Sequence, residues 1–439
     1  MTRHCKAPLA FAAIVAAGLL CWTARAQAPF DKLQRDQARA MLKDVHDALK
    51  KNYFDPNFRG VDIESRFKVA DAQLEKANSL GAALTTIAGV LNELHDSHTF
   101  FVPPSRNVHR EYGFVQQMIG DRCFITAVRP NRDASEKLAL GDEVFAWEGN
   151  QPTRDNFKTL GYIFNTLLSL QKTTLRIRTP NGEERQVELT PKVIQEKKVL
   201  DIHNDNDFWK MIRDEENVEH EYRQRIVERG DALMVWKMPE FDLSDDEADR
   251  YLKQARKYST LVLDLRGNPG GLVKTLEHVV GGVMDHNVAI ASRSGRRPGL
   301  KPTLAKSLGT YSGKLIVLID SGSASAAELF ARVVQLEHRG IVLGDRSAGA
   351  VMESRRYEFH QGVNTQFFYG ASITDADLTM SDGKNLERAG VNPDETILPT
   401  SADLAAGRDP VLARAAEMAG VGLDAAAAGK LFPIEWRKE

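Results

Sequence analysis

KLIVLIDSGSASAAELFARVVQLE, residues 314–337, has the pattern of a strand, a tight turn and a helix. Residues 316–319 are apolar and β-favouring, as expected of a strand that is buried on both faces. Residues 320–324 are small or turn-forming. From residue 325 onward, apolar side chains recur at helical spacing. The stretch therefore predicts a β-α unit of an α/β domain, with serines at the junction.

The junction contains Ser323 and Ser325. Backbone N–H groups at a helix N-terminus lack partners and can hold an anion, including the oxyanion that forms when a hydroxyl attacks an amide. Serine is also an ordinary N-cap residue, so this stretch alone favours capping. Two further segments, described below, favour a reactive hydroxyl instead.

Residues 1–26 have the composition of a secretory signal peptide. Arg3 and Lys6 precede an apolar run at residues 9–20, and the tripeptide ARA at 24–26 is a small-x-small cleavage site. The apolar run is too short to span a bilayer comfortably, which disfavours a retained anchor. We therefore expect an exported protein, periplasmic or secreted, with no stable membrane span after cleavage.

Charge and cysteine content narrow the possible functions. The formal net charge is −2, and loss of residues 1–26, which hold three basic residues and no acid, makes it −5. A mildly acidic protein offers no electrostatic reason to bind nucleic acid. Only Cys123 would remain of the three cysteines. A single cysteine cannot form an internal disulfide, so stability must come from the packed cores.

Residues 30–105 have helical periodicity, with turn signals at residues 55–57 and 81 between three amphipathic stretches. Short connections between such helices predict a small antiparallel bundle. The third stretch ends in ELHDSHT at residues 93–99, and an extended segment follows it.

Residues 111–193 predict a β domain, because short β-favouring runs alternate there with turn residues and one helical stretch interrupts them at 154–170. Residues 125–144, which include ITAVRP and GDEV, resemble a PDZ domain. In that family, a Gly-Phe loop and the strand after it bind the free C-terminus of a peptide by adding it to the sheet edge. The resemblance assigns this role to Gly113, Phe114 and Val115. A small β-barrel without a ligand is the alternative.

Strands and helices alternate again after a charge-rich connector at residues 194–230. This alternation predicts a largely parallel sheet in an α/β core that spans residues 200–400. The tail, residues 401–439, is Ala-rich and helical, with no chemistry that its pattern indicates. The expected strands are 233–236, 261–265, 315–319 and 341–343, and the expected helices are 244–258, 271–284 and 325–337.

The second informative segment is DLRGNPGG at residues 264–271, where a buried strand ends in a glycine-rich turn before a helix. Glycine lets the backbone approach a bound atom closely and lets amides point inward. The segment lacks the Lys-Ser/Thr ending of a P-loop and the spacing of a dinucleotide fingerprint. A plain strand–helix turn is the alternative.

The third informative residue is His98, which is the most plausible general base of the chain. Histidines at helix ends are more often surface or capping residues. His95 and His98 lie three positions apart, as metal ligands can, but no third ligand is evident and the H-E-x-x-H pattern is absent. We therefore expect neither a metal nor another cofactor.

Together these segments resemble the tail-specific (C-terminal processing) and tricorn-core-like serine peptidases, through D-x-R-x-N-x-G-G at 264–271 and SASAAE at 323–328. The resemblance implies a ClpP/crotonase-like β-α-β catalytic core, with a PDZ-like β domain and an N-terminal helical bundle. It also implies Ser325 as nucleophile. The amide of Ala326, with that of Gly270 or Gly271, is then the oxyanion hole.

One departure from the family pattern affects the base. The dyad branch carries its lysine in G-E-x-T-x-G-K, whereas the matching GDRSAGA at 344–350 ends in Ala350. A serine hydroxyl still needs a base. The tricorn-like branch uses Ser, His and Glu, which match Ser325, His98 and Glu387, with Asp382 as a rival acid. The resemblance implies that His98 accepts the Ser325 proton and Glu387 orients the imidazole.

The sequence therefore predicts an exported serine endopeptidase that binds extended polypeptides. If the PDZ-like segment binds them, it binds their C-termini. The activity is expected to fall on acidification. Its oligomeric state is open. One alternative is a peptide-binding protein that lost activity together with the lysine. Another is thioester or related chemistry on a crotonase-like core, which the expected export and the missing nucleotide signature disfavour.

Overall fold

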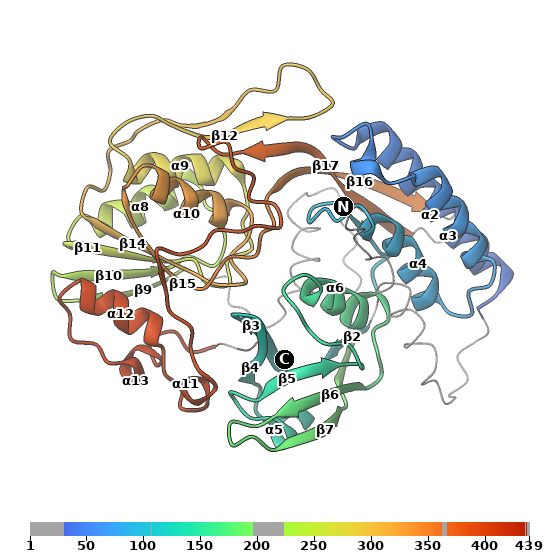
Figure 1. The fold of residues 1–439 in the computed structure, drawn as a ribbon, viewed down its shortest axis with the longest axis horizontal. Coiled ribbons are helices and arrows are strands. Elements are labelled where there is room, and N and C mark those ends of the chain that lie inside the picture. Colours follow the sequence, from blue (N-terminus) through green and yellow to red (C-terminus); the bar gives the residue numbers. More distant parts are fainter. Residues whose placement is uncertain (1–29, 107, 196–223, 362–366, 435, 437–439) are drawn as a thin grey trace, which may run out of the picture.

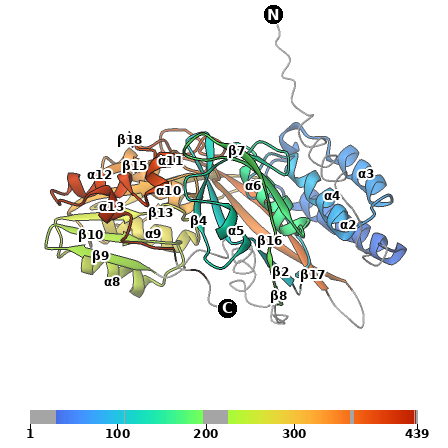
Figure 2. The same cartoon turned by 90° about the horizontal axis from the view of Figure 1, so that it is seen from below.

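The computed structural model describes residues 30–106, 108–195, 224–361, 367–434 and 436. The predicted leader at residues 1–26 and residues 196–223 of the connector lie outside this part of the chain. Figure 1 shows the described elements in three groups, and Figure 2 shows the N-terminal helices and the largest sheet at opposite ends of the molecule.

The largest sheet has six strands in the order β18-β15-β14-β11-β10-β9. β10, β11, β14, β15 and β18 pair in parallel, and β9 pairs with β10 in the antiparallel direction at the edge of the sheet. The expectation of a largely parallel sheet is therefore confirmed. The strands are β9 (Arg225–Arg229), β10 (Leu233–Lys237), β11 (Thr260–Asp264), β14 (Lys314–Ile319), β15 (Gly340–Gly344) and β18 (Glu395–Thr396).

Helices cover both faces of this sheet (Figure 1). Along β10, Met234 and Trp236 join the apolar cluster of one face, while Leu233 and Val235 join the cluster of the other. Strands that are buried on both faces need apolar residues at every position, which explains the continuous apolar runs of the sequence. The first face is covered by α8 (Asp245–Ala255), α9 (Val273–Val283) and α10 (Ala326–Leu336), and the second by α12 (Pro410–Met418), near α11 (Ser401–Ala405) and α13 (Ala425–Ala428).

The N-terminal helices pack against one another, as their periodicity predicts, and also against a second sheet that the sequence did not predict. A long hairpin forms most of that sheet, and Phe54 N donates to Thr374 O at 2.9 Å across the contact. The helices are α2 (Lys32–Asn52), α3 (Ile63–Leu74) and α4 (Leu80–Asn92). The strands are β1 (Phe100–Val102), β12 (Val288–Ser294), β13 (Thr303–Ala305), β16 (Met352–Gln361) and β17 (Phe367–Thr379).

A third group is an antiparallel sheet in the order β3-β4-β5-β6-β7, hereafter the β3–β7 domain. The predicted β domain at residues 111–193 thus contains this sheet, and β3 lies at its edge. The domain comprises β3 (Phe114–Ile119), β4 (Arg122–Val128), α5 (Asp133–Lys137), β5 (Glu143–Trp147), α6 (Phe157–Gly161), η2 (Tyr162–Leu167), β6 (Thr173–Arg178) and β7 (Glu184–Leu189). The pair β2 (Val108–Glu111) and β8 (Lys192–Gln195) flanks the domain in the chain, whereas η1 (Phe58–Gly60) lies between α2 and α3 and contacts Tyr53 of the N-terminal helices.

No helix within the described ranges combines the length and the apolar character that a membrane crossing requires. Cys123 is buried in β4 and unpaired, and burial raises the pKa of its thiol well above the usual range.

Asp264, at the end of β11, ties the sheet to α12 through charged partners. Its carboxylate binds Arg266 at 2.8 Å and Lys237 at 3.4 Å, and Arg266 also binds Asp409 at 2.8 Å. Burial alone would raise the pKa of Asp264, but the two cations outweigh it and hold the pKa well below its usual range. These contacts give Asp264 and Arg266 a structural role in the core.

We expect Asp264→Ala to lower the free energy of unfolding by about 3–5 kcal/mol, because it leaves the buried charge of Arg266 partly unpaired. The loss should appear in urea titrations at neutral pH. It should shrink only in strong acid, because a depressed carboxyl pKa stabilises the fold above the unfolded-state value of about 3.9. Asp285→Ala, at an exposed position, is the control and should leave the urea midpoint unchanged; an equal loss in both variants would contradict the account.

Candidate active site

The candidate site lies at the carboxyl edge of the parallel sheet. β11, β14 and β15 are neighbours in parallel, so the loops that follow them leave the sheet at the same edge. Those loops hold the glycine-rich turn after Asp264, the turn before Ser325, and the segment that ends in Ala350. Ser325 N donates to Ala350 O at 2.9 Å, which joins the last two loops directly.

Ser325 has a strained backbone, with φ 53° and ψ −117°, at the residue before α10. Positive φ is rare for residues other than glycine and costs on the order of 1–3 kcal/mol. Its side chain makes no cap hydrogen bond to α10. The sharp turn thus holds a half-buried hydroxyl at a helix N-terminus, where a strained turn can present a side chain for reaction.

Ser323 has a different, structural role. Its side chain is fully buried, accepts from Asp320 N at 2.9 Å and donates to Leu265 O at 2.7 Å. These bonds tie the turn after β14 to the turn after β11. The side chain of Ser323 thus bonds to the loops rather than to the helix. At Ser325 the helix start is closed through the backbone, because Ser325 N donates to Glu328 Oε2 at 3.1 Å and Ser325 O accepts from Glu328 N at 2.9 Å.

Glu328 fixes the loop of Ser325 from inside the protein. Its buried carboxylate accepts from Ser325 N at 3.1 Å, Ala350 N at 2.8 Å, Gly349 N at 2.7 Å and Ser347 Oγ at 2.6 Å. Burial raises the pKa of Glu328, and hydrogen bonds from Ser347, Gly349 and Ala350 offset part of that rise. Four donors on one carboxylate explain how the strained turn persists.

The glycine-rich turn lies directly against Ser325. A side chain on Gly270, which has φ +107°, would put its Cβ 2.6 Å from Ser325 Cβ and 3.0 Å from Ala326 N. Gly270 N already donates to Asn268 Oδ1 at 2.8 Å. Among the described residues, the amides of Gly271 and Ala326 have no acceptor. Of the two glycines that the sequence left open, Gly271 thus has the amide that is available to an oxyanion.

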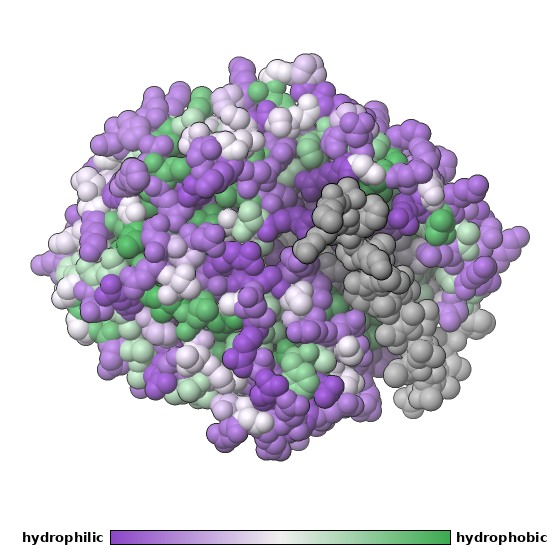
Figure 3. Space-filling model, in the orientation of Figure 1, coloured by the Kyte–Doolittle hydropathy of each residue, from purple (hydrophilic) through white to green (hydrophobic). Residues whose placement is uncertain are grey.

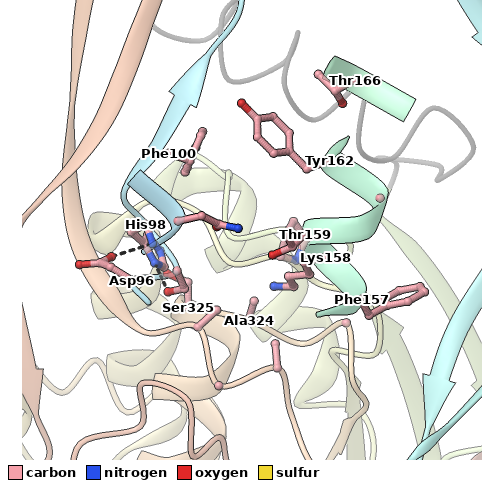
Figure 4. Close-up of a pocket in the computed structure, with 18 of the residues that line it drawn as sticks. Asp96, His98, Phe100, Phe157, Lys158, Thr159, Tyr162, Thr166, Ala324 and Ser325 are labelled. Carbon is pink, nitrogen blue, oxygen red and sulfur yellow. Dashed lines mark hydrogen bonds between the residues drawn. The ribbon is translucent and has the colours of Figure 1, made fainter. Parts of the chain in front are cut away.

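His98 reaches the site from the N-terminal helices. It lies in the loop between α4 and β1, and Asp96 holds that loop with bonds from His98 N at 3.0 Å and Thr99 N at 3.1 Å. Tyr53 Oη and Thr374 Oγ1 bind the same carboxylate at 2.9 and 2.7 Å. Figure 4 shows Asp96, His98 and Ser325 close together in the pocket.

Ser97 lies between His98 and Glu387. Ser97 Oγ donates to Glu387 Oε2 at 2.7 Å and lies 2.8 Å from His98 Nδ1, while Ser97 N donates to Glu387 Oε1 at 2.8 Å. A hydroxyl has one proton, so a hydroxyl that donates to Glu387 must accept from Nδ1–H of His98. The other ring nitrogen, Nε2, is then unprotonated and able to act as a base.

Electrostatics keep the imidazole neutral. Burial lowers the pKa of His98 to about 4, with Asp96 opposing and Lys158 adding to the shift. Burial also raises the pKa of Glu387, and hydrogen bonds from Ser97 and Val351 offset part of that rise. The rival acid Asp382 instead pairs with Arg332 at 2.5 Å and with Lys384. Among the described residues, no three His, Cys, Asp or Glu side chains gather as metal ligands would.

The three predicted peptide-binding residues lie where β3 begins. Gly113 has φ +77°, and its carbonyl accepts from Arg129 N at 2.8 Å. Phe114 and Val115 begin β3, which pairs only with β4 in the described chain. Gln117 Nε2 donates to Asp320 Oδ2 at 2.7 Å, which ties β3 to the turn before Ser325.

One cleft joins these parts, because its lining includes β3, α6, the glycine-rich turn, His98 and Ser325. Figure 3 shows hydrophilic residues around the hollow at the centre of the molecule. Sequence reasoning did not assign roles to Ser97 or Asp96, although both flank His98 in the quoted segment. A hydroxyl and a carboxylate beside a candidate base were the signal that could have found them.

Comparison with known proteins gives a family for part of the chain. Residues 234–397, which include Ser325 and Glu387 but not His98, match the model described as Peptidase family S41. The tail-specific protease of Haemophilus influenzae is 25% identical over 282 residues, which cover 60% of this chain and 38% of that protein. The chloroplastic C-terminal processing peptidase of Tetradesmus obliquus is 29% identical over 141 residues, which cover 32% of this chain and 29% of that protein.

The chain thus spans well under half the length of either relative. Among solved structures, mature CPAF aligns with a TM-score of 0.63 at 16% identity and covers 85% of this chain and 95% of that chain. At this identity, the likeness concerns the fold alone.

We expect Gly270→Ala to suppress the reaction of Ser325 with a fluorophosphonate probe at least ~100-fold, because the new Cβ and the Ser325 side chain cannot both keep their places. Gly267→Ala is the matched control: φ is +74° there too, but a Cβ would meet nothing within 4 Å. The control should lose stability by about 1 kcal/mol and keep its labelling. Equal labelling of the two variants would contradict the proximity of Gly270 to the hydroxyl.

Proposed function

We propose that this chain, whose residues 234–397 match the model of Peptidase family S41, hydrolyses peptide bonds of extended or unfolded polypeptides at Ser325. The proposal rests on the hydrogen-bonded series from Glu387 through Ser97 to His98. The last member of the series, His98, lies near the strained Ser325 (Figure 4). The same geometry supports a Ser-His-Glu site in which Ser97 transmits the effect of the carboxylate.

Ser325 Oγ attacks the carbonyl carbon of the scissile peptide, and its proton passes to Nε2 of His98. The tetrahedral intermediate carries its negative charge on the former carbonyl oxygen. His98 then gives the proton to the amide nitrogen as the carbon–nitrogen bond breaks, which leaves an acyl ester on Ser325 and a free amine. A water molecule, deprotonated by His98, hydrolyses the ester and restores the hydroxyl.

Two amides can stabilise the oxyanion of these steps. The Ala326 amide lies at the N-terminus of α10, where the helix dipole favours negative charge. The Gly271 amide lies in the turn against Ser325, and neither amide has an acceptor among the described residues. Gly270 contributes by leaving room for the nucleophile rather than by donating, since its amide is bonded to Asn268.

His98 replaces the lysine of the dyad peptidases in this proposal. Ala350 occupies the lysine position, and its amide and carbonyl bond to Glu328 and Ser325. The methyl group of Ala350 cannot accept a proton, whereas a neutral His98 can. The base is thus supplied by the N-terminal helices instead of by the loop after β15.

The finer fold assignment belongs to the same proposal. Parallel strands alternate with α8, α9 and α10, which supports a ClpP/crotonase-like core. The edge strand β3 behind Gly113 and the nearby α6 support a PDZ-like domain, which would add a peptide to β3 by its C-terminus. The composition of residues 1–26 supports export to the periplasm or the medium.

We expect Ser325→Ala to abolish cleavage of an unfolded protein substrate, with a loss of at least ~10⁴-fold in kcat/KM. Ser97→Ala should lower kcat by about 10²-fold or more, because the imidazole loses the partner that fixes its tautomer. Both variants should keep the wild-type circular dichroism spectrum. Purified wild-type chain that neither cleaves nor reacts with a fluorophosphonate would overturn the peptidase proposal and leave a peptide-binding protein.

The pH dependence follows from the neutral imidazole. Because burial lowers the pKa of His98 to about 4, His98 remains unprotonated well below the usual histidine value of about 6.5. We expect kcat/KM to stay nearly level from pH 8 to about 5.5 and to halve only near pH 4. Circular dichroism over the same range separates protonation from unfolding. An activity that halves near pH 6.5 while the fold persists would contradict this account of His98.

A further inference from the structure

Lys158 extends from the β3–β7 domain toward the nucleophile. It is the second residue of α6 and lines the same cleft as Ser325. Figure 4 shows its side chain pointing from α6 toward Ala324 and Ser325, from the side opposite His98. An exposed lysine at this place brings a positive charge beside the scissile bond of any bound polypeptide.

Arg154 fixes the chain segment that carries Lys158. Its guanidinium donates to Gly120 O at 2.7 Å, to Arg346 O at 2.7 Å, and pairs with Asp345. Only 12% of the Arg154 side chain is exposed, and its three guanidinium nitrogens each bind a different acceptor, so the side chain is held firmly. The start of α6 is therefore anchored to the loop after β15, next to the segment that contacts Ser325.

The ammonium group of Lys158 has no anionic partner among the described residues. Other lysines of the same domain do: Lys137 pairs with Asp133 at 2.8 Å, and Lys172 with Glu188 at 2.6 Å. Asp155, three positions before Lys158, also lines the cleft but forms no ion pair with it. The charge of Lys158 is thus available to a bound anion.

The cations at the far end of β3 already share a buried carboxylate. Arg129 and Arg132 both bind the buried Glu111, at 2.6 and 3.1 Å, close to Gly113. A carboxylate near Gly113 would compete with Glu111 for guanidinium groups that already bind a carboxylate. A carboxylate beside Ser325 would meet an unpaired ammonium group. The positive charge of Lys158 also reaches the site, because it makes a small contribution that lowers the pKa of both His98 and Glu328.

We propose that Lys158 binds a carboxylate of the polypeptide substrate next to the scissile bond and so determines which peptides are cleaved. This inference rests on the proposed function, since the substrate class is taken from it. The carboxylate has two possible sources: the free C-terminus of the polypeptide, or an Asp or Glu side chain near the scissile bond. Both present the same anion to the ammonium group, so the test separates them.

The test measures binding rather than cleavage, using the full chain with Ser325→Ala and fluorescent forms of one short neutral peptide. The first pair of peptides compares a free C-terminal carboxylate with a C-terminal amide. The second pair, both amidated, compares an internal Glu with an internal Gln. We expect the carboxylate form of at least one pair to bind about tenfold more tightly than its neutral form.

Adding Lys158→Gln should bring that ratio close to one, Lys158→Glu should invert it, and Lys158→Arg should retain most of it. Lys172→Gln is the matched control and should keep the ratio of the parent. A ratio that survives Lys158→Gln, or no preference in either pair, overturns the proposal. Failure of the peptidase proposal is seen separately, as an absence of Ser325-dependent cleavage, and would leave the binding ratios measurable.

Discussion

The carboxylate of Glu387 connects two parts of the molecule that are 290 positions apart in the chain. One oxygen binds the Ser97 amide, and the other binds the Ser97 hydroxyl and the Val351 amide. The first two bonds reach the loop that carries His98, and the third reaches the strand that begins beside Ser325. Without this carboxylate, the loop of His98 would keep its link to β17 through Asp96 and Thr374, but it would lose its hydrogen-bonded connection to the segment beside Ser325.

Other carboxylates of the site stabilise the strained backbone of Ser325 and the loop of His98. Ser325 holds a backbone conformation that costs on the order of 1–3 kcal/mol, and Glu328 stabilises it with four hydrogen bonds from buried or partly buried donors. Asp96 holds the base from the other side and links it to β17 through Thr374. Each reactive group thus has one buried or partly buried carboxylate that fixes its backbone.

The parallel sheet, its helices and the glycine-rich turn could be predicted from the sequence, because apolar runs and turn residues are local signals. The hairpin β16–β17 could not, since MESRRYEFHQ at 352–361 has no clean alternation and its face is covered by distant helices. The role of Ser97 depends on the contact with Glu387, which no local pattern encodes. No local pattern distinguishes Lys158 from other surface lysines, because its position in the cleft depends on the packing of α6.

We propose that Ser97 joins Glu387 to a neutral His98, whose Nε2 is free to accept the Ser325 proton. Nitrogen NMR of ¹⁵N-histidine-labelled chain, with His98 assigned through His98→Gln, tests this directly at pH 7. The account predicts a neutral ring with its proton on Nδ1, and a change of that tautomer balance in Ser97→Ala. A ring protonated on Nε2, or a His98 signal that Ser97→Ala leaves unchanged, would contradict it.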